Sequence, residues 1–220
     1  MLNLDLENII IAVIWILAVL LSLAVHEYAH AQYADWAGDP TPRRQGRVTL
    51  NPIAHLDPLG TVLIIFMAFS GYGIGWGKPV PVNPGYFRHP RRDWVLCAFV
   101  GPLSNIVLAV IFALPLRLLY PPDVPLPDNV FVDFLLAAVY VNIGLAVFNM
   151  IPLHPLDGSK VLSGFLRDVF DSRYWGFQVV YGPIILFGSI LILPLLGLPN
   201  PLRYILLPAR EFLVKLLLGA

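Results

Sequence analysis

The stretch Asn8–Tyr33, NIIIAVIWILAVLLSLAVHEYAHAQY, determines how the rest of the sequence is interpreted. Its apolar part, residues 8–25, nearly reaches the roughly 20 residues that a membrane-spanning helix needs. His26, Glu27 and His30 follow directly. Polar side chains at the end of a membrane helix are costly to bury unless something binds them. This stretch therefore predicts a membrane helix that carries a functional site at its end.

The amino-acid composition supports a membrane protein. Of the 220 residues, 58% are hydrophobic and 13% are charged, whereas soluble domains average about 45–50% and about 25%. The 14 basic and 14 acidic residues balance, so we expect the lipid bilayer as a partner and no nucleic acid. The single cysteine, Cys97, excludes an intramolecular disulfide and a cysteine-rich metal site.

Four apolar segments are long enough for membrane spans, so we expect an all-α polytopic membrane protein with a single domain over residues 1–220. The first helix can continue to Trp36, because no glycine or proline precedes Gly38. The spans are expected at about 8–36, 95–119, 130–151 and 181–198. Residues 59–70 are apolar but too short to cross, which favours a re-entrant or interfacial segment.

Two segments between the first and second spans lack helical character. Residues 46–52, GRVTLNP, have a short apolar core between turn residues, which predicts a strand-like segment. Residues 75–84, GWGKPVPVNP, contain too many glycines and prolines for a helix. After the fourth span, residues 201–218 space basic side chains among leucines, which predicts an amphipathic interfacial helix or a shorter fifth membrane helix.

The basic residues predict the orientation in the cell membrane. They cluster after the first span and before the second (Arg43, Arg44, Arg47, Lys78, Arg88, Arg91 and Arg92). Under the positive-inside rule both clusters face the cytoplasm, which requires that residues 59–70 do not cross. The acidic N-terminus and the loop after the second span then lie outside. The third span returns inward, so we expect His26, His30 and Asp157 at the same, cytoplasmic face.

The sequence HEYAH at residues 26–30 matches the zinc-binding pattern HExxH. On a helix, positions i and i+4 share one face, so both imidazoles can reach a single metal ion. Zinc with three protein ligands lowers the pKa of a bound water from 15.7 to about 7, and Glu27 lies near enough to take its proton. The alternative is a chance match with two core histidines, but ionisable groups at a membrane span are rare and usually functional.

A catalytic zinc site of this kind needs a third protein ligand. His55 and His89 lie in polar loops and are expected to be solvated, and Glu211 lies in the tail. Asp157 follows the third span on the expected cytoplasmic side. Judged by its position alone, Asp157 fits a metal ligand and the N-cap of a following helix equally well.

Three motifs together resemble the site-2 protease family of intramembrane zinc metalloproteases. They are HEYAH, GPLSN at residues 101–105 and NMIPLHPLDG at residues 149–158. Residues 46–61, GRVTLNPIAHLDPLGT, and 75–84 look like the short prokaryotic branch of that family, which lacks appended PDZ and CBS domains. The resemblance implies a helical membrane metalloprotease with one zinc ion per chain.

The resemblance also implies roles for individual residues. His26, His30 and Asp157 would hold the zinc ion, and Glu27 would be the general base. Asn149 matches the family's asparagine before the ligand aspartate. It would donate a hydrogen bond to the substrate carbonyl as negative charge develops there.

His154 departs from the family pattern, in which an apolar residue or a proline is expected. Pro155 favours an extended conformation of His154. A fourth ligand, a gate, a partner of a ligand and a surface histidine near the cytoplasmic mouth all remain open, and the surface histidine is the simplest. Asn105 and Asn142 are expected to form hydrogen bonds between helices rather than to act in catalysis.

We therefore expect a metalloprotease that cuts a transmembrane or membrane-proximal segment of another protein near the cytoplasmic face. A substrate helix must unwind first, because its amides are already hydrogen-bonded. Residues 47–50 or 75–84 could then hold the opened segment by β-strand addition. The alternatives are a zinc-binding scaffold without proteolysis and a metal transporter. Glu27 argues against the scaffold, and the scarcity of polar residues in the second and fourth spans argues against the transporter.

Overall fold

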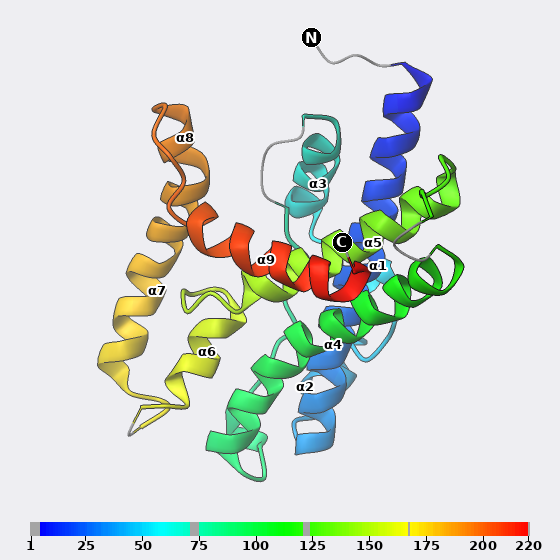
Figure 1. The fold of residues 1–220 in the computed structure, drawn as a ribbon. Coiled ribbons are helices and arrows are strands. Elements are labelled where there is room, and N and C mark those ends of the chain that lie inside the picture. The colour runs from blue at the N-terminus through cyan, green and yellow to red at the C-terminus, as the bar shows by residue number, and fades with distance from the viewer. Residues whose placement is uncertain (1–4, 71–74, 121–123, 167, 220) are drawn as a thin grey trace.

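The structure is a computed structural model that describes residues 5–70, 75–120, 124–166 and 168–219. These residues form helices joined by loops and contain no β-sheet (Figure 1), which confirms the all-α class. The longer helices are α1 (Leu6–Ala37), α3 (Pro58–Ser70), α4 (Pro90–Leu119), α5 (Val130–Asn149), α7 (Ser172–Phe187) and α9 (Arg203–Leu218). The shorter ones are α2 (Thr41–Arg44), α6 (Asp157–Ser163), α8 (Leu193–Leu195), the 3-10 turns η1 (Pro52–His55) and η2 (Pro84–Tyr86), and the π-helical turn η3 (Gly188–Ile192).

Four of the described helices are long and apolar enough to cross a membrane, as predicted. They are Leu6–Ala37, Pro90–Leu119, Val130–Asn149 and Ser172–Leu195, the last being α7 continued through η3 and α8. The second and fourth begin well before residues 95 and 181, where the apolar segments start. Proline is compatible with the first turn of a helix, which allows α4 to begin at Pro90, and the side chain of Asp171 caps the first turn of α7. Polar first turns therefore extend both helices beyond their apolar parts.

Helices α1, α4 and α5 pack against one another and form the core around the site. Their contact faces are rich in buried alanines (Ala18, Ala24, Ala31 and Ala34 on α1, Ala98, Ala109 and Ala113 on α4, Ala137 and Ala138 on α5). Small side chains let helix backbones approach closely, which is how membrane helices associate in lipid. The close approach brings buried polar groups of the three helices within hydrogen-bonding distance of one another.

Helix α1 carries the HEYAH motif in its second half. It begins after Asp5, whose side chain accepts a hydrogen bond from the backbone of Asn8, and it ends at Gly38. Gly38 has φ 111°, a left-handed conformation that favours glycine at a helix C-terminus. Because the helix is uninterrupted, His26 and His30 lie one turn apart on one face, and both are buried.

The segment between α1 and α4 covers one side of this core. Helix α3 contains the predicted apolar segment 59–70. Residues 48 and 49 form bends and residues 47 and 50 have no regular secondary structure, so the prediction of a strand there is wrong. The physical reason is the buried Arg47 side chain, which donates to the carbonyl oxygens of Lys78 and Pro79 where a strand would pair through its backbone. Residues 75–83 form neither helix nor strand and make only an isolated bridge, between Gly77 and Leu56.

The C-terminal helices flank the other side of the core. Helix α6 packs against α4, and α7 lies on the opposite side of the molecule from α1 (Figure 1). The predicted tail helix is present as α9, which crosses α5 and α4 and buries Val214 among their apolar side chains. This arrangement leaves the end of α5 and the start of α6 facing the middle of α1.

Candidate metal centre

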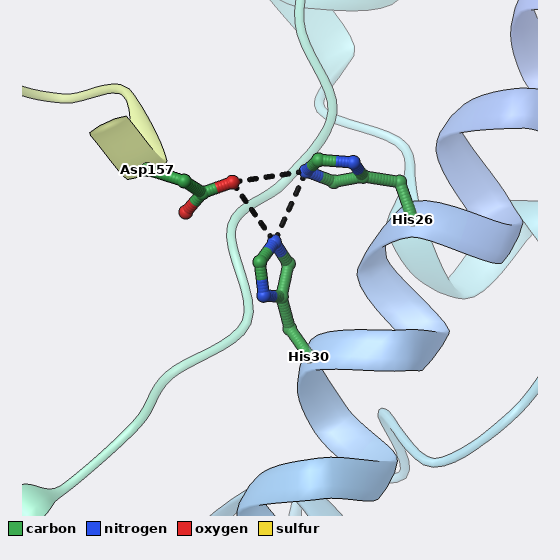
Figure 2. A group of neighbouring side chains, drawn as sticks. All are labelled: His26, His30 and Asp157. Carbon is green, nitrogen blue, oxygen red and sulfur yellow. Dashed lines mark hydrogen bonds and ion pairs between the residues drawn. The ribbon is translucent and has the colours of Figure 1, made fainter. Parts of the chain in front are cut away.

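Three side chains from α1 and α6 each bring one potential ligand atom to a common point (Figure 2). His26 Nε2 lies 3.0 Å from His30 Nε2, and Asp157 Oδ2 lies 3.2 Å from His26 Nε2 and 3.1 Å from His30 Nε2. All three residues are buried. Four-coordinate zinc with bonds of about 2.0–2.1 Å places its ligand atoms about 3.3 Å apart. The spacing of the three atoms is therefore close to that of zinc ligands.

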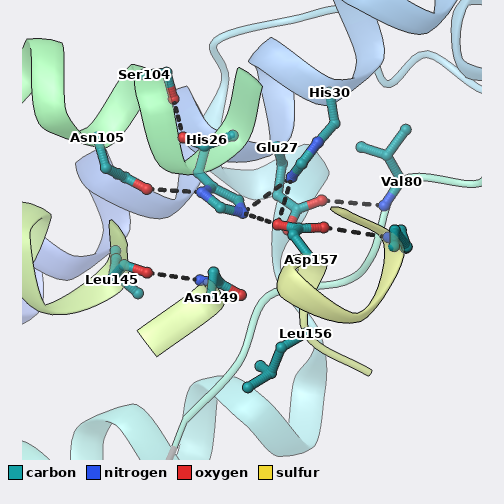
Figure 3. Close-up of polar contacts among 12 residues, drawn as sticks. His26, Glu27, His30, Val80, Ser104, Asn105, Leu145, Asn149, Leu156 and Asp157 are labelled. Atoms are coloured by element: carbon teal, nitrogen blue, oxygen red, sulfur yellow. Dashed lines mark hydrogen bonds and ion pairs between the residues drawn. The ribbon is translucent and has the colours of Figure 1, made fainter. Parts of the chain in front are cut away.

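Hydrogen bonds on the far side of each imidazole determine which nitrogen faces this point. His26 Nδ1 lies 2.7 Å from Asn105 Oδ1 (Figure 3), and His30 Nδ1 lies 2.6 Å from the carbonyl oxygen of Cys97. Both partners are acceptors, so each neutral ring carries its proton on Nδ1 and has a lone pair on Nε2. Two lone pairs and one carboxylate oxygen therefore converge. Such an arrangement is repulsive on its own and favourable around a cation, so the donor set fits a zinc ion.

A chain of buried amides extends the support of His26 across three helices. Asn105 Nδ2 donates to Asn142 Oδ1 at 2.8 Å and to the carbonyl oxygen of Ser22 at 3.2 Å. Asn142 Nδ2 in turn donates to the carbonyl oxygen of Ala138 at 2.8 Å. Since the acceptors around Asn105 Nδ2 are oxygens, Asn105 Oδ1 is the atom left for His26. The expected interhelical bonds are present, and Asn105 also orients His26, a role that the sequence argument did not assign.

Two glycines of the sequence motifs are required because neighbouring atoms lie too close to leave room for a side chain. A Cβ atom on Gly101 would lie 2.2 Å from His30 Nε2 and 2.8 Å from His26 Cε1. A Cβ atom on Gly158 would lie 2.3 and 2.4 Å from the carbonyl oxygens of residues 150 and 151. In GPLSN, the glycine thus makes room for both rings and the asparagine one turn later holds one of them. In LDG, the glycine lets α6 start against the end of α5.

Asp157 is the first residue of α6, and its carboxylate does not cap that helix. Leu156 occupies the N-cap position, and no side chain forms a capping bond. Asp157 Oδ2 faces the histidines, while Asp157 Oδ1 accepts a hydrogen bond from Lys160 Nζ at 3.2 Å. Burial acts to raise the pKa of the Asp157 carboxyl, whereas the charge of Lys160 acts to lower it. Lys160 therefore favours the ionised carboxylate that a metal ligand must be.

A cavity of about 400 Å³ opens beside these three side chains. Its walls come from α1, residues 75–82, α4, the end of α5, α6 and α7. Glu27 lines the cavity, and its Oε2 accepts a hydrogen bond from the backbone N–H of Val80 at 3.0 Å (Figure 3). Glu27 is not one of the three converging residues. Its carboxylate instead faces the space in which a water molecule and a peptide could meet it.

Asn149 lines the same cavity from the end of α5. Its side-chain Nδ2 donates to the carbonyl oxygen of Leu145 at 3.0 Å, one turn back on the same helix (Figure 3). In this conformation the Asn149 amide is satisfied within α5. A hydrogen bond to a substrate carbonyl would require a different rotamer of that side chain.

His154 lies against α7 and away from the metal centre. Its backbone N–H donates to Gln178 Oε1 at 2.9 Å, and its ring centroid lies 6.4 Å from that of Trp175. Burial lowers the pKa of His154, and the nearby charge of Lys160 lowers it further. The structure places His154 outside both the converging group and the cavity lining.

The other sequence candidates are also distant from the converging group. His89 and Glu211 are exposed. His55 was expected to be solvated, and that prediction is wrong, because His55 is 1% exposed and its Nε2 lies 2.8 Å from the carbonyl oxygen of Thr49. The buried Arg47 packs beside it, at 3.4 Å from His55 Nδ1. The prediction failed because this loop, although polar in composition, contains a small buried core.

Sequence reasoning missed two residues next to the centre. Lys160 lies three residues after Asp157, and an acid and a base at this spacing on a helix are neighbours, so the pair could have been recognised. The contact of the Val80 backbone N–H with Glu27 could not have been recognised from the sequence, because only the tertiary structure brings residues 75–83 against Glu27.

Comparison with known proteins agrees with this geometry. The profile described as peptidase family M50 matches residues 118–187, which include Asn149 and Asp157 but not HEYAH. The protein named "Putative zinc metalloprotease YwhC" of Bacillus subtilis is 37% identical over 194 residues, which is 83% of this chain and 85% of YwhC. The chain belongs to peptidase family M50. This is the site-2 protease family, so the protein is a membrane metalloprotease with zinc as its metal.

Other relatives are longer than the region they share with this chain. Proteins named "Putative zinc metalloprotease Rip2" match from two mycobacteria. The one from Mycolicibacterium smegmatis is 27% identical over 73% of this chain and 62% of its own length. The one from Mycobacterium tuberculosis strain H37Rv is 31% identical over 67% of this chain and 55% of its own length. No solved structure matches the chain.

Proposed function

We propose that this M50 protein is an intramembrane protease that hydrolyses a peptide bond in or near a transmembrane segment of another protein. In this proposal His26, His30 and Asp157 hold one zinc ion per chain, Glu27 is the general base, and Asn149 stabilises developing charge. The observation that carries the proposal is the convergence of two imidazole lone pairs and a carboxylate oxygen beside a glutamate in a cavity.

Zinc, when bound, would polarise the scissile carbonyl and make a water molecule acidic enough to lose a proton near neutral pH. Glu27 follows His26 directly in the sequence, but its side chain lines the cavity. Its carboxylate can therefore accept that proton without replacing a ligand. It would then pass the proton to the leaving amine nitrogen. The hydrogen bond from Val80 N–H to Glu27 Oε2 orients the carboxylate and leaves Oε1 for this transfer.

Asn149 would act on the substrate carbonyl oxygen. By rotating away from the carbonyl oxygen of Leu145, its Nδ2 could donate to the oxygen on which negative charge grows. Leu145 would then lose a side-chain hydrogen bond that is additional to the helix backbone, which is a small cost. Asn149 therefore fits an oxyanion-stabilising role and needs only a side-chain rotation to fulfil it.

The substrate must present an unwound segment, because the carbonyl groups of an intact helix are already hydrogen-bonded. Residues 75–83 are the part of the cavity wall best suited to hold such a segment, since they form no helix and are not paired in a sheet. Residues 47–50 no longer qualify, because they contain two bends and no strand. We propose that residues 75–83 bind the opened substrate by β-strand addition.

The cleavage would take place near the cytoplasmic face of the cell membrane. Basic residues concentrate in the loops and helix ends that join α1 to α4 (Arg43, Arg44, Lys78, Arg88, Arg91 and Arg92). The positive-inside rule places this region in the cytoplasm and the start of α1 outside. The metal centre lies in the half of α1 that leads to these basic residues.

The test is to compare the native chain with Glu27→Gln, using Glu7→Gln at the exposed start of α1 as a matched control. Each variant would be co-expressed with a panel of terminally tagged single-span membrane proteins, and new chain ends would be located by mass spectrometry. We expect fragments ending in or beside the cytoplasmic half of a span from the native chain and from Glu7→Gln. Glu27→Gln should bind zinc normally and produce none. Cleavage by Glu27→Gln would refute the role of the base, and cuts confined to external ends would refute the orientation.

A further inference from the structure

Lys160 is a charged residue of the cavity wall to which the proposed reaction assigns no role. It lies three residues after Asp157 on α6, and its side chain is 30% exposed. Its Nζ lies 3.2 Å from Asp157 Oδ1 and 5.9 Å from the centroid of the Trp94 ring on α4. A carboxylate on one side and an aromatic face on another are both favourable neighbours for an ammonium group. Together they fix the position of Nζ between α6 and α4.

The two oxygens of Asp157 therefore have separate partners. Oδ2 lies within 3.2 Å of the Nε2 atoms of both His26 and His30, whereas Oδ1 is bonded to Lys160. The bond to Lys160 holds the carboxylate plane so that one oxygen faces the histidines and the other faces away. The start of α6 is itself fixed, because Gly158 lies directly against the backbone carbonyls of residues 150 and 151.

This separation matters for a metal that catalyses hydrolysis. A carboxylate can bind a metal through one oxygen or through both, and a catalytic zinc needs a position that no protein atom fills. We propose that Lys160 is a positioning residue that holds Asp157 as a one-oxygen ligand and so keeps the fourth zinc position free for water and substrate. The proposal rests on His26, His30 and Asp157 being the zinc ligands.

The charge of Lys160 suits this role. Its Nζ lies 3.2 Å from Asp157 Oδ1 and donates a hydrogen bond to that oxygen. The ammonium group thus competes for Oδ1 with the zinc ion, which would otherwise attract both oxygens. A neutral side chain at position 160 would leave Oδ1 without its partner and allow it to turn toward the metal.

The experiment uses the full chain in detergent, with cobalt(II) in place of zinc, because the visible absorption of cobalt(II) reports its coordination number. The variants are Lys160→Met, which removes the charge, and Lys160→Arg, which keeps it. Lys215→Met serves as the matched control, because Lys215 is exposed on α9 and does not line the cavity. Zinc affinity is measured alongside by competition with a chelator, and cleavage by the assay described above.

We expect the native chain, Lys215→Met and Lys160→Arg to show the intense bands of four-coordinate cobalt. Lys160→Met should bind cobalt but show the weaker bands of a five-coordinate ion. Its cleavage rate should fall by about 10-fold or more, and its zinc affinity should change by about 10–100-fold, the range typical of groups that orient metal ligands. If Lys160→Met does not fold, the same measurements on Lys160→Gln decide the question.

An unchanged four-coordinate spectrum and an unchanged cleavage rate in the uncharged variant would overturn the proposal and leave Lys160 as a structural partner of α6. That failure is distinguishable from failure of the ligand set itself. If Asp157→Ala binds cobalt with the native affinity and spectrum, the ligand assignment is wrong, and the role of Lys160 falls with it.

Discussion

The two halves of the candidate metal centre are held in different ways. His26 and His30 lie on one long helix, and the far nitrogen of each ring is bonded to α4, with a further buried link to α5. Asp157 comes from a helix of 7 residues, and its carboxylate is held by Lys160 on the same helix. The histidine half is thus fixed by the packing of three spanning helices. The aspartate half depends on local contacts of α6 and its neighbours.

This difference predicts different consequences of substitution. Substitutions of the buried residues that contact the two histidines should disturb zinc binding and helix packing together, because the same buried groups serve both. Changes of Asp157 or Lys160 themselves should alter zinc binding more than the fold. The following substitutions test that contrast.

The largest effect is expected from Gly101→Ala. The added Cβ atom would lie 2.2 Å from His30 Nε2, so the ring or the helix must move. Overpacking of this kind costs about 1–3 kcal/mol in stability, and displaced rings would no longer meet Asp157. We expect loss of zinc in metal analysis and a lower unfolding temperature in detergent. Gly144→Ala on α5 is the control, because a Cβ atom there would meet nothing within 4 Å. Normal zinc binding by Gly101→Ala would contradict the close contact described above.

A smaller effect is expected from Asn105→Ala. This change removes the acceptor for His26 Nδ1 and leaves Asn142 Oδ1 without its donor. Loss of a group that orients a ligand typically lowers metal affinity by about 10–100-fold. Chelator competition should show a drop in this range, and thermal unfolding should show a loss of stability as well. Ser104→Ala is the control, since the Ser104 hydroxyl donates to the carbonyl oxygen of Gly101 in its own helix. Equal zinc affinities for the two variants would show that Asn105 does not orient His26.

The smallest effect is expected from Gln178→Ala on α7. Gln178 accepts from the N–H of His154 and donates to the carbonyl oxygen of Pro152, and so ties α7 to the loop before Asp157. A typical hydrogen bond contributes about 0.5–1.5 kcal/mol, so the free energy of unfolding should fall by about 1 kcal/mol or slightly more. Zinc affinity should fall less than in Asn105→Ala. A larger fall would mean that α7, rather than Lys160, positions the aspartate half.

The histidine half could be predicted from local sequence. An uninterrupted helical segment with HEYAH at its end fixes the relative position of the two histidines, because i and i+4 share a face whatever the rest of the fold does. The four spans were predictable for the same reason, since their apolar length is a local property. The true starts of the second and fourth spans, at Pro90 and Ser172, were not predictable, because the polar first turns of these helices carry no hydropathy signal.

The aspartate half could not be derived from local sequence. Position alone left Asp157 equally suited to a cap and to a ligand, and the family resemblance supplied the choice. The contacts that matter there are tertiary: Gly158 against the end of α5, Lys160 over Trp94, and Val80 against Glu27. The strand predicted at residues 47–50 failed for a related reason, because the burial of Arg47 depends on a segment more than 30 residues away.

The most direct test of the central claim is the amount of zinc per chain in detergent-purified protein. It would be measured for the native chain, for Asp157→Ala, and for Asp168→Ala, an exposed acidic residue outside the site, as control. We predict about one zinc per chain in the native protein and in Asp168→Ala, and a sharp loss in Asp157→Ala. Undiminished zinc in Asp157→Ala would contradict the account, because the aspartate half would then contribute nothing to holding the metal.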